Sequence, residues 1–360
     1  MFRIEMLPAR QGDAILVEYG QDGEPPHRIL VDGGTPGTKS DLRARLLELG
    51  TPPIRLDLLV VTHIDGDHIG GVLEMLEDDP QIVTFDDVWF NAWRHLPAEQ
   101  VEPLGPVQGE RLTTWLNNHG SPWNVAFDSQ AAAVPDDGDL PEAPLPEGMR
   151  VTVLAPGDAE LATLRPVWER EVRDAGLEPG TPYSEEEAIP TSVAALGPPP
   201  TREDVERWAA TPFSKDGSEA NGASVSLLLE FEGRSALLTG DAHSDPLIRG
   251  IDRLLDARGA DRLDVDVFKL PHHGSRRNVS SELLERVHAG AYLFSTNGAQ
   301  YGHPDLEAVA RVALAAEDAR LCFNYEDRVG IWREPGLVDE LGYAIEAPGE
   351  GTLRIDINSA

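Results

Sequence analysis

The chain has 360 residues, with 30 lysines and arginines against 63 aspartates and glutamates, and a formal net charge of −33. This charge favours solubility and repels nucleic acid at long range, which excludes a non-specific, salt-dependent DNA-binding protein. Cys322 is the only cysteine, so we expect neither disulfides nor a cysteine zinc cluster. No apolar run has membrane-spanning length and the N-terminus lacks a signal-peptide core, so we expect a cytoplasmic protein with no membrane partner.

Residues 13–34 are predicted to form a hairpin of two short apolar strands, 14–17 and 28–31. Asp13 and Asp32 lie at the two ends of this unit, and each stands beside a glycine or a glycine-rich turn. Turn formation explains either aspartate, and neither by itself identifies a site.

The most informative stretch follows the apolar run 58–61, which predicts a buried strand. Two histidines and two aspartates fall within the next few residues, before a predicted helix. They are His63, Asp65, Asp67 and His68. Imidazole and carboxylate groups suit divalent first-row metals, and four of them exceed what one tetrahedral ion takes from a single loop, so we expect two ions. Helix capping would explain Asp67 but neither histidine.

Residues 96–220 differ in character, because Pro-rich and acidic stretches typical of loops and linkers appear among them. They include a plausible strand at 150–154 and helical stretches near 161–175 and 202–209. We interpret the segment as an insertion or lid over the active-site face. It contains no motif that indicates a function.

The second half of the chain again shows regular strands, and several end in polar groups. The strand at 235–238 leads to Asp241, and the strand at 265–270 leads to His272 and His273. A further strand at 292–295 leads to Asn297 and His303. Strand ends at one edge of a sheet converge, so residues distant in sequence can form one site.

These motifs carry a resemblance to a known family. The pattern His-x-Asp-x-Asp-His-x-Gly-Gly at 63–71 resembles the signature loop of the metallo-β-lactamase-fold hydrolases, with Asp65 where histidine is more common. Together with Leu-Leu-Thr-Gly-Asp-Ala at 237–242 and Leu-Pro-His-His-Gly-Ser at 270–275, it resembles the hydrolase domain of ComEC-type competence proteins and their stand-alone relatives. The resemblance implies an α+β fold, the αββα four-layer sandwich. Its halves would be residues 1–95 and 221–360, on either side of a large loop-rich insertion, 96–220.

The resemblance assigns roles only at matching positions. It implies that His63 and Asp65 bind a first metal. It implies that Asp67 and His68 bind a second, with Asp241 bridging the two. His273 matches the last ligand of the second metal, with His272 as the alternative. Asp13 and Asp32 match residues that orient ligands beneath the metals.

One histidine of the first metal site has no recognisable match. His95 and His119 are available, although each is more typical of a surface or core histidine. Asn221 stands where ComEC-like relatives carry a polar Asn-Ser pair, and it is an alternative ligand. Because two carboxylates belong to this half of the site, manganese becomes an alternative to zinc.

Two such ions would turn a bridging water into a hydroxide nucleophile near neutral pH. The predicted catalytic residues are Asp67 and His303, with His303 donating to the leaving oxygen or holding phosphate. Basic side chains near the metal histidines favour a phosphoryl substrate. The predicted substrate-binding residues are Lys269, Arg276, Arg277 and Asn297. An ordinary exposed basic pair at a helix start explains Arg276 and Arg277 equally well.

We therefore expect a metal-dependent hydrolase, most simply a dinuclear zinc or manganese phosphodiesterase or nuclease that acts on a nucleotide or nucleic acid. One alternative is a thioester, lactone or β-lactam hydrolase of the same fold, which needs no cationic cluster. Another is a non-catalytic, metal-stabilised binding module whose protein partner docks on residues 96–220.

Overall fold

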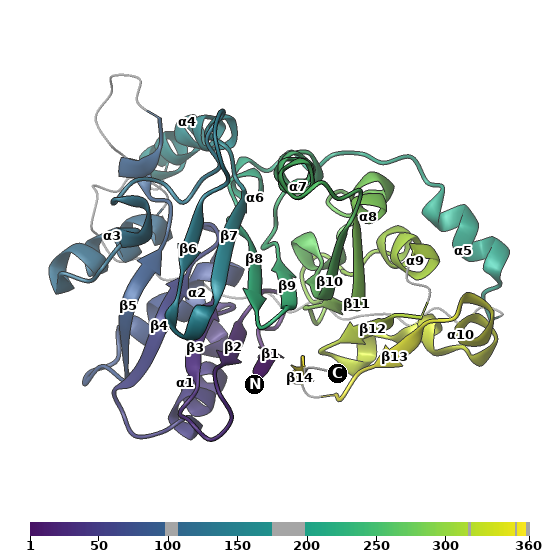
Figure 1. The fold of residues 1–360 in the computed structure, drawn as a ribbon, viewed down its shortest axis with the longest axis horizontal. Coiled ribbons are helices and arrows are strands. Elements are labelled where there is room, and N and C mark those ends of the chain that lie inside the picture. Colours follow the sequence, from purple (N-terminus) through teal and green to yellow (C-terminus); the bar gives the residue numbers. More distant parts are fainter. Residues whose placement is uncertain (98–106, 175–198, 316–317, 350, 358–360) are drawn as a thin grey trace.

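The computed structural model describes residues 1–97, 107–174, 199–315, 318–349 and 351–357. Two β-sheets form the centre of the molecule, and helices lie along their outer faces (Figure 1). None of the helices within these ranges is long and apolar enough to cross a membrane.

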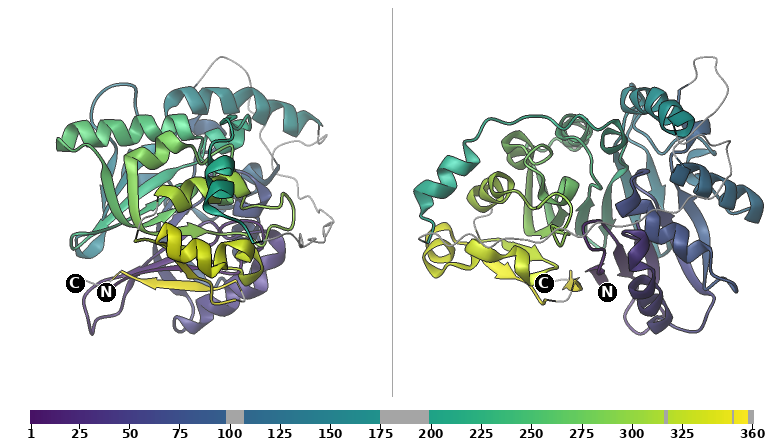
Figure 2. Two further views of the ribbon diagram at one scale, coloured as in Figure 1. Left: turned by 90° about the vertical axis from the view of Figure 1, so that its right-hand side faces the viewer. Right: turned by 180° about the vertical axis from the view of Figure 1, so that it is seen from behind.

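The first sheet has six strands in the order β14-β1-β2-β3-β4-β5. In chain order they are β1 (Phe2–Met6), β2 (Ile15–Tyr19), β3 (His27–Val31), β4 (Ile54–Val60), β5 (Val83–Trp89) and β14 (Leu353–Asp356). Strands β3, β4 and β5 run parallel. Strand β14 pairs antiparallel with β1, with Ile355 opposite Ile4, so the two ends of the described chain lie side by side (Figure 2).

The second sheet has eight strands in the order β13-β12-β11-β10-β9-β8-β7-β6. They are β6 (Glu142–Pro144), β7 (Arg150–Ala155), β8 (Ser226–Phe231), β9 (Arg234–Leu238), β10 (Leu263–Lys269), β11 (Val287–Phe294), β12 (Arg320–Phe323) and β13 (Ala344–Glu346). Strands β9 to β13 run parallel. Strand β7 pairs antiparallel with β8, so this part of the predicted insertion belongs to the sheet and not to a loop-rich lid. The boundaries at 96 and 220 stay predictions.

Side-chain alternation along each strand builds the layers. In β4, Leu58 and Val60 join the core between the two sheets, whereas Leu59 packs with helices α1 (Lys39–Glu48) and α2 (Gly66–Leu76). In β10, Val267 joins the core between the sheets and Phe268 packs with α7 (Ser244–Arg258). The fold is therefore the αββα sandwich that the sequence predicts.

The remaining helices extend the two outer layers. Helices α3 (Val107–His119) and α4 (Asp158–Asp174) contribute to the core on the first sheet. Those on the second sheet are α5 (Arg202–Ala209), α8 (Ser281–Arg286), α9 (Leu306–Ala315) and α10 (Pro335–Leu341). The short α6 (Glu219–Gly222) precedes β8.

Candidate metal centre

One carboxylate oxygen, Asp241 Oδ2, lies at the centre of the site. Four imidazole Nε2 atoms surround it, from histidines in the loop after β4, in the first turn of α2 and in the turn after β10. They lie at 3.3 Å for His68, 3.5 Å for His273, 3.7 Å for His272 and 3.9 Å for His63. The loops after β4, β9 and β10 therefore converge as predicted for strand ends on one edge.

Two further carboxylates flank different histidines. Asp65 Oδ2 lies 3.7 Å from His63 Nε2, and Asp67 Oδ2 lies 3.8 Å from His273 Nε2. Asp65 is the N-cap residue of α2, yet its side chain makes no capping hydrogen bond. Helix capping therefore does not account for this carboxylate.

Asp32 positions the rings of His63 and His68 through their Nδ1 atoms, directly for His68 and through Thr62 for His63. His68 Nδ1 donates to Asp32 Oδ2 at 2.8 Å. The Thr62 hydroxyl also donates to Asp32 Oδ2, at 2.7 Å, so its oxygen accepts from His63 Nδ1 at 3.0 Å. Nδ1 of each ring is thus engaged as a donor and Nε2 is directed towards Asp241, where a metal ion can take the place of any proton on it, as in metal-binding histidines. Thr62 directly precedes His63, but a single threonine there gives no signal of this role in the sequence.

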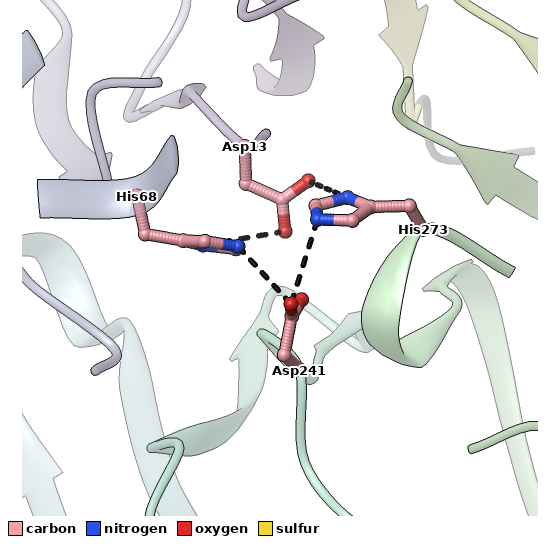
Figure 3. A group of neighbouring side chains, drawn as sticks. All are labelled: Asp13, His68, Asp241 and His273. Atoms are coloured by element: carbon pink, nitrogen blue, oxygen red, sulfur yellow. Dashed lines mark ion pairs between the residues drawn. The ribbon is translucent and has the colours of Figure 1, made fainter. Parts of the chain in front are cut away.

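Asp13 lies behind His273. Its Oδ1 is 3.3 Å from His273 Nδ1 and its Oδ2 is 4.0 Å from His68 Nδ1 (Figure 3). It also forms a buried ion pair with Lys269. Burial acts to raise the pKa of Asp13, but the charges of Lys269 and His273 outweigh it and hold that pKa below its usual value. Asp13, His68, Asp241 and His273 together form a buried group whose potential ligand atoms all lie within 4.8 Å of one another.

His272 has its own set of partners, two of which sequence reasoning missed. Its Nδ1 lies 3.0 Å from Asn278 Oδ1 and 3.2 Å from Asp216 Oδ2. The amide of Asn221 donates to the same Asp216 oxygen at 2.7 Å. Asp216 lies in a segment without a recognisable motif, so no signal identified it. Asn221 lines the pocket, and its Oδ1 has no hydrogen-bond partner among the described residues.

The local backbone places both adjacent histidines at the centre. His272 and His273 have left-handed φ angles of 48° and 55°, in the turn after β10. Such conformations cost roughly 1–3 kcal/mol each for a residue other than glycine and persist where the surroundings fix them. Gly274 continues the turn with a φ of 83°, where an added Cβ would lie 2.8 Å from Phe294 and from Pro304.

His272 lies beside Asp241, whereas His95 and His119, the two candidates for the missing ligand of the first metal, do not. His95 is buried away from the centre, and both its ring nitrogens are engaged, one with the Ala92 amide and the other with Arg94. Burial and the charge of Arg94 lower its pKa to about 4. His119 is exposed at the end of α3 and stacks on Trp115.

A pocket of about 460 Å³ opens onto the centre. Its lining residues are Asp65, Asp67, Asp216, Ser218, Asn221, Asp241, His272, Ser275, Arg276, Arg277, Tyr301, His303 and Asp305. The ring of His303 lies 5.1 Å from that of His272, and its Nδ1 is 3.5 Å from Asp305 Oδ2. Arg276 is engaged by Glu307 at 2.9 Å, whereas no carboxylate of the described residues lies within ion-pair distance of Arg277.

Two predicted substrate-binding residues lie elsewhere. Lys269 is fully buried, because alternation along β10 places it on the same face as Val267, between the sheets. Its ammonium group pairs with Asp13 and donates to Gly240 O at 3.3 Å, so it does not reach the pocket. Asn297 does not line the pocket either, because its side chain accepts from the Ala299 amide within its own loop.

The donor set fits divalent metal. The Nε2 atoms of His63, His68 and His273 are buried without hydrogen-bond partners, as is Asp241 Oδ1. Burial acts to lower the pKa of His273, but Asp241 and Asp13 outweigh it and raise that pKa to about 9. The centre thus favours a positive charge, and its imidazole nitrogens and carboxylate oxygens are ligands that zinc and manganese accept.

The chain is distantly similar to several known proteins. The chain is 24% identical over 135 residues to ComE operon protein 3 of Bacillus subtilis (strain 168), a match that covers 35% of this chain and only 17% of that protein. Among solved structures, CmlA, a diiron β-hydroxylase from Streptomyces venezuelae, is 14% identical with a TM-score of 0.42, over 99% of this chain and 54% of that one. Human tRNase Z, short form, is 10% identical with a TM-score of 0.37, over 99% of this chain and all of that one, 100%. These structural likenesses are too distant to bear on the site.

The sequence as a whole gives the assignment. The family model described as the metallo-beta-lactamase superfamily matches residues 7–296, which include every histidine and aspartate around Asp241. The chain therefore belongs to the metallo-beta-lactamase superfamily.

Proposed function

We propose that the protein is a phosphodiesterase that uses two divalent metal ions, zinc or manganese. His63, Asp65 and His272 would hold one ion, and Asp67, His68 and His273 the other, with Asp241 shared. Bound there, the ions would supply Lewis-acid activation of water and of the phosphoryl group.

The observation that carries the proposal is the position of Arg277 and His303 in the pocket beside this centre. The Arg277 guanidinium has no carboxylate partner among the described residues, so it is available for a phosphoryl oxygen. His303, with Asp305 beside its Nδ1, is suited to donate a proton to the leaving oxygen. Asp67 faces the same pocket and is suited to accept a proton from the attacking water.

The test is hydrolysis of bis-p-nitrophenyl phosphate by metal-stripped protein reloaded with zinc or manganese. Turnover that requires metal and is lost in Asp241→Asn, which barely changes size, supports the proposal. Hydrolysis of a thioester or lactone without any phosphodiester cleavage, in folded and metal-loaded protein, contradicts it.

A further inference from the structure

The charges around the pocket are unfavourable for a long polyanion. Five of its lining residues are aspartates. Of the two lining arginines, Arg276 is already neutralised by Glu307, so only Arg277 is available to pair with a substrate phosphate. Two divalent ions would offset four negative charges, but only at the centre itself. A nucleic-acid groove instead needs cations along the path of successive phosphates.

The rest of the sequence does not supply such a path. The chain carries a net charge of −33, and the segments 98–106 and 175–198 contain glutamates but neither lysine nor arginine. Whatever their position, these segments add no positive charge. The electrostatics therefore favour a substrate with a single phosphodiester group.

An exposed aromatic side chain marks a second feature of the pocket. Tyr301 is 63% exposed, the highest value among the large apolar side chains in the described ranges, and it lines the pocket. Its ring lies 6.0 Å from that of His303, which in turn lies 5.1 Å from that of His272. Gln300 donates to the Tyr301 hydroxyl at 3.0 Å, and Gln11 donates to Gln300 at 3.3 Å, so the first sheet's loop helps to hold the ring in place.

We infer that the substrate is a small phosphodiester that carries a nucleobase, with its phosphoryl group beside Arg277 and the base stacked on Tyr301. This inference rests on the proposed function and narrows it to nucleotide-sized substrates rather than nucleic-acid polymers. A volume of about 460 Å³ is within the range of pockets for small ligands. Every base has a flat aromatic face, so stacking on a tyrosine does not depend on which base is present.

The first experiment compares two esters with the same leaving group, thymidine 5′-(p-nitrophenyl phosphate) and methyl p-nitrophenyl phosphate. Tyr301→Ala is expected to raise KM for the thymidine ester roughly tenfold, with little change for the methyl ester, and Tyr301→Phe is expected to retain the wild-type KM. Val125→Ala, at a side chain that is 58% exposed and does not line the pocket, is the control. An equal rise in KM for both esters, or no rise for either, overturns the inference.

The second experiment compares a dinucleoside monophosphate with a 20-nucleotide single strand. The protein is expected to cleave the small diester with the higher kcat/KM, and added salt is expected to increase cleavage of the strand by screening repulsion. Preference for the strand, with kcat/KM that falls steeply as salt rises, overturns the inference. If wild-type protein cleaves bis-p-nitrophenyl phosphate, a contrary result in either experiment overturns only the inferred substrate class and leaves the proposed phosphodiesterase activity standing. If it cleaves no phosphodiester, the proposed function fails and the inference falls with it.

Discussion

Lys269 and Asp13 form an ion pair that is buried between the two sheets, directly behind the metal-centre histidines. Asp13 faces His273 and His68, and Lys269 also donates to the backbone of Gly240, the residue before Asp241. The pair therefore links three of the segments that supply ligands. We therefore expect the pair to fix ligand positions and not to contact substrate.

Replacing Lys269 by methionine should destabilise the protein and weaken metal binding together. Breaking one side of a buried pair leaves an unpaired charge and costs roughly 3–5 kcal/mol. Loss of a partner that orients ligands lowers metal affinity by about 10- to 100-fold. Thermal unfolding of metal-free protein and titration with zinc measure the two effects.

The control is Lys215→Met, which removes an exposed ion pair with Asp245 and should change stability by no more than about 1 kcal/mol. Adding Asp13→Asn to Lys269→Met removes the unpaired charge and should recover part of the stability but not the metal affinity. Unchanged metal affinity in Lys269→Met would contradict the positioning role.

His272 should be required for one of two ions. Replacing it by alanine removes an imidazole beside Asp241 while His68 and His273 stay in place, so the metal content should fall from about two ions per chain to about one. Elemental analysis of the reloaded protein gives the ratio. His95→Ala, which alters a buried histidine outside the centre, should retain both ions. A content of two ions in His272→Ala would exclude it as a ligand.

Most of this centre could be predicted from local sequence, because its residues follow strands with clear apolar patterns. The loop 63–68, Asp241 and the pair His272-His273 each come directly after such a strand, and parallel strand ends share one edge. The four layers were implied by the resemblance to the metallo-β-lactamase fold. These features depend on residues close together in the chain.

The remaining features depend on contacts between distant segments. Lys269 stands at a strand end beside two histidines, and only the approach of Asp13 from the other sheet makes it an interior residue. Asp216 lies beside the centre because it contacts Asn221, His272 and Asn278, which come from different segments. Strand β6 lies in a Pro-rich stretch whose local composition suggests a loop, and its pairing with β7, a strand that the sequence does predict, overrides that preference.

Replacing Arg277 by alanine should lower kcat/KM for a phosphodiester far more than replacing its neighbour Arg276. Arg277→Ala removes the guanidinium that has no carboxylate partner and should lower kcat/KM for a phosphodiester roughly tenfold or more, the effect of losing a hydrogen bond to a charged group. Arg276→Ala should change it by less than about threefold, because Glu307 already engages that side chain. Steady-state kinetics with bis-p-nitrophenyl phosphate compare them. Equal and negligible effects, with thioester turnover intact, would favour acyl hydrolysis instead.

Metal binding should strengthen as pH rises from about 6.5 to about 9. Burial acts to lower the pKa values of the centre's histidines, but neighbouring carboxylates raise that of His273 to about 9 and that of His68 well above its ordinary value. A raised pKa in the folded state means that protonation stabilises metal-free protein below the unfolded pKa of about 6.5, and that this stabilisation is lost as pH rises towards 9. Metal must displace the same protons, so the competition between protons and metal weakens over the same range.

The difference in Tm between metal-loaded and metal-free protein should therefore grow with pH. Calorimetric titration in buffers of different ionisation enthalpy should show protons released on binding, fewer at pH 9 than at pH 7. A Tm difference that stays constant or shrinks across this range would show that these histidines do not exchange protons for metal.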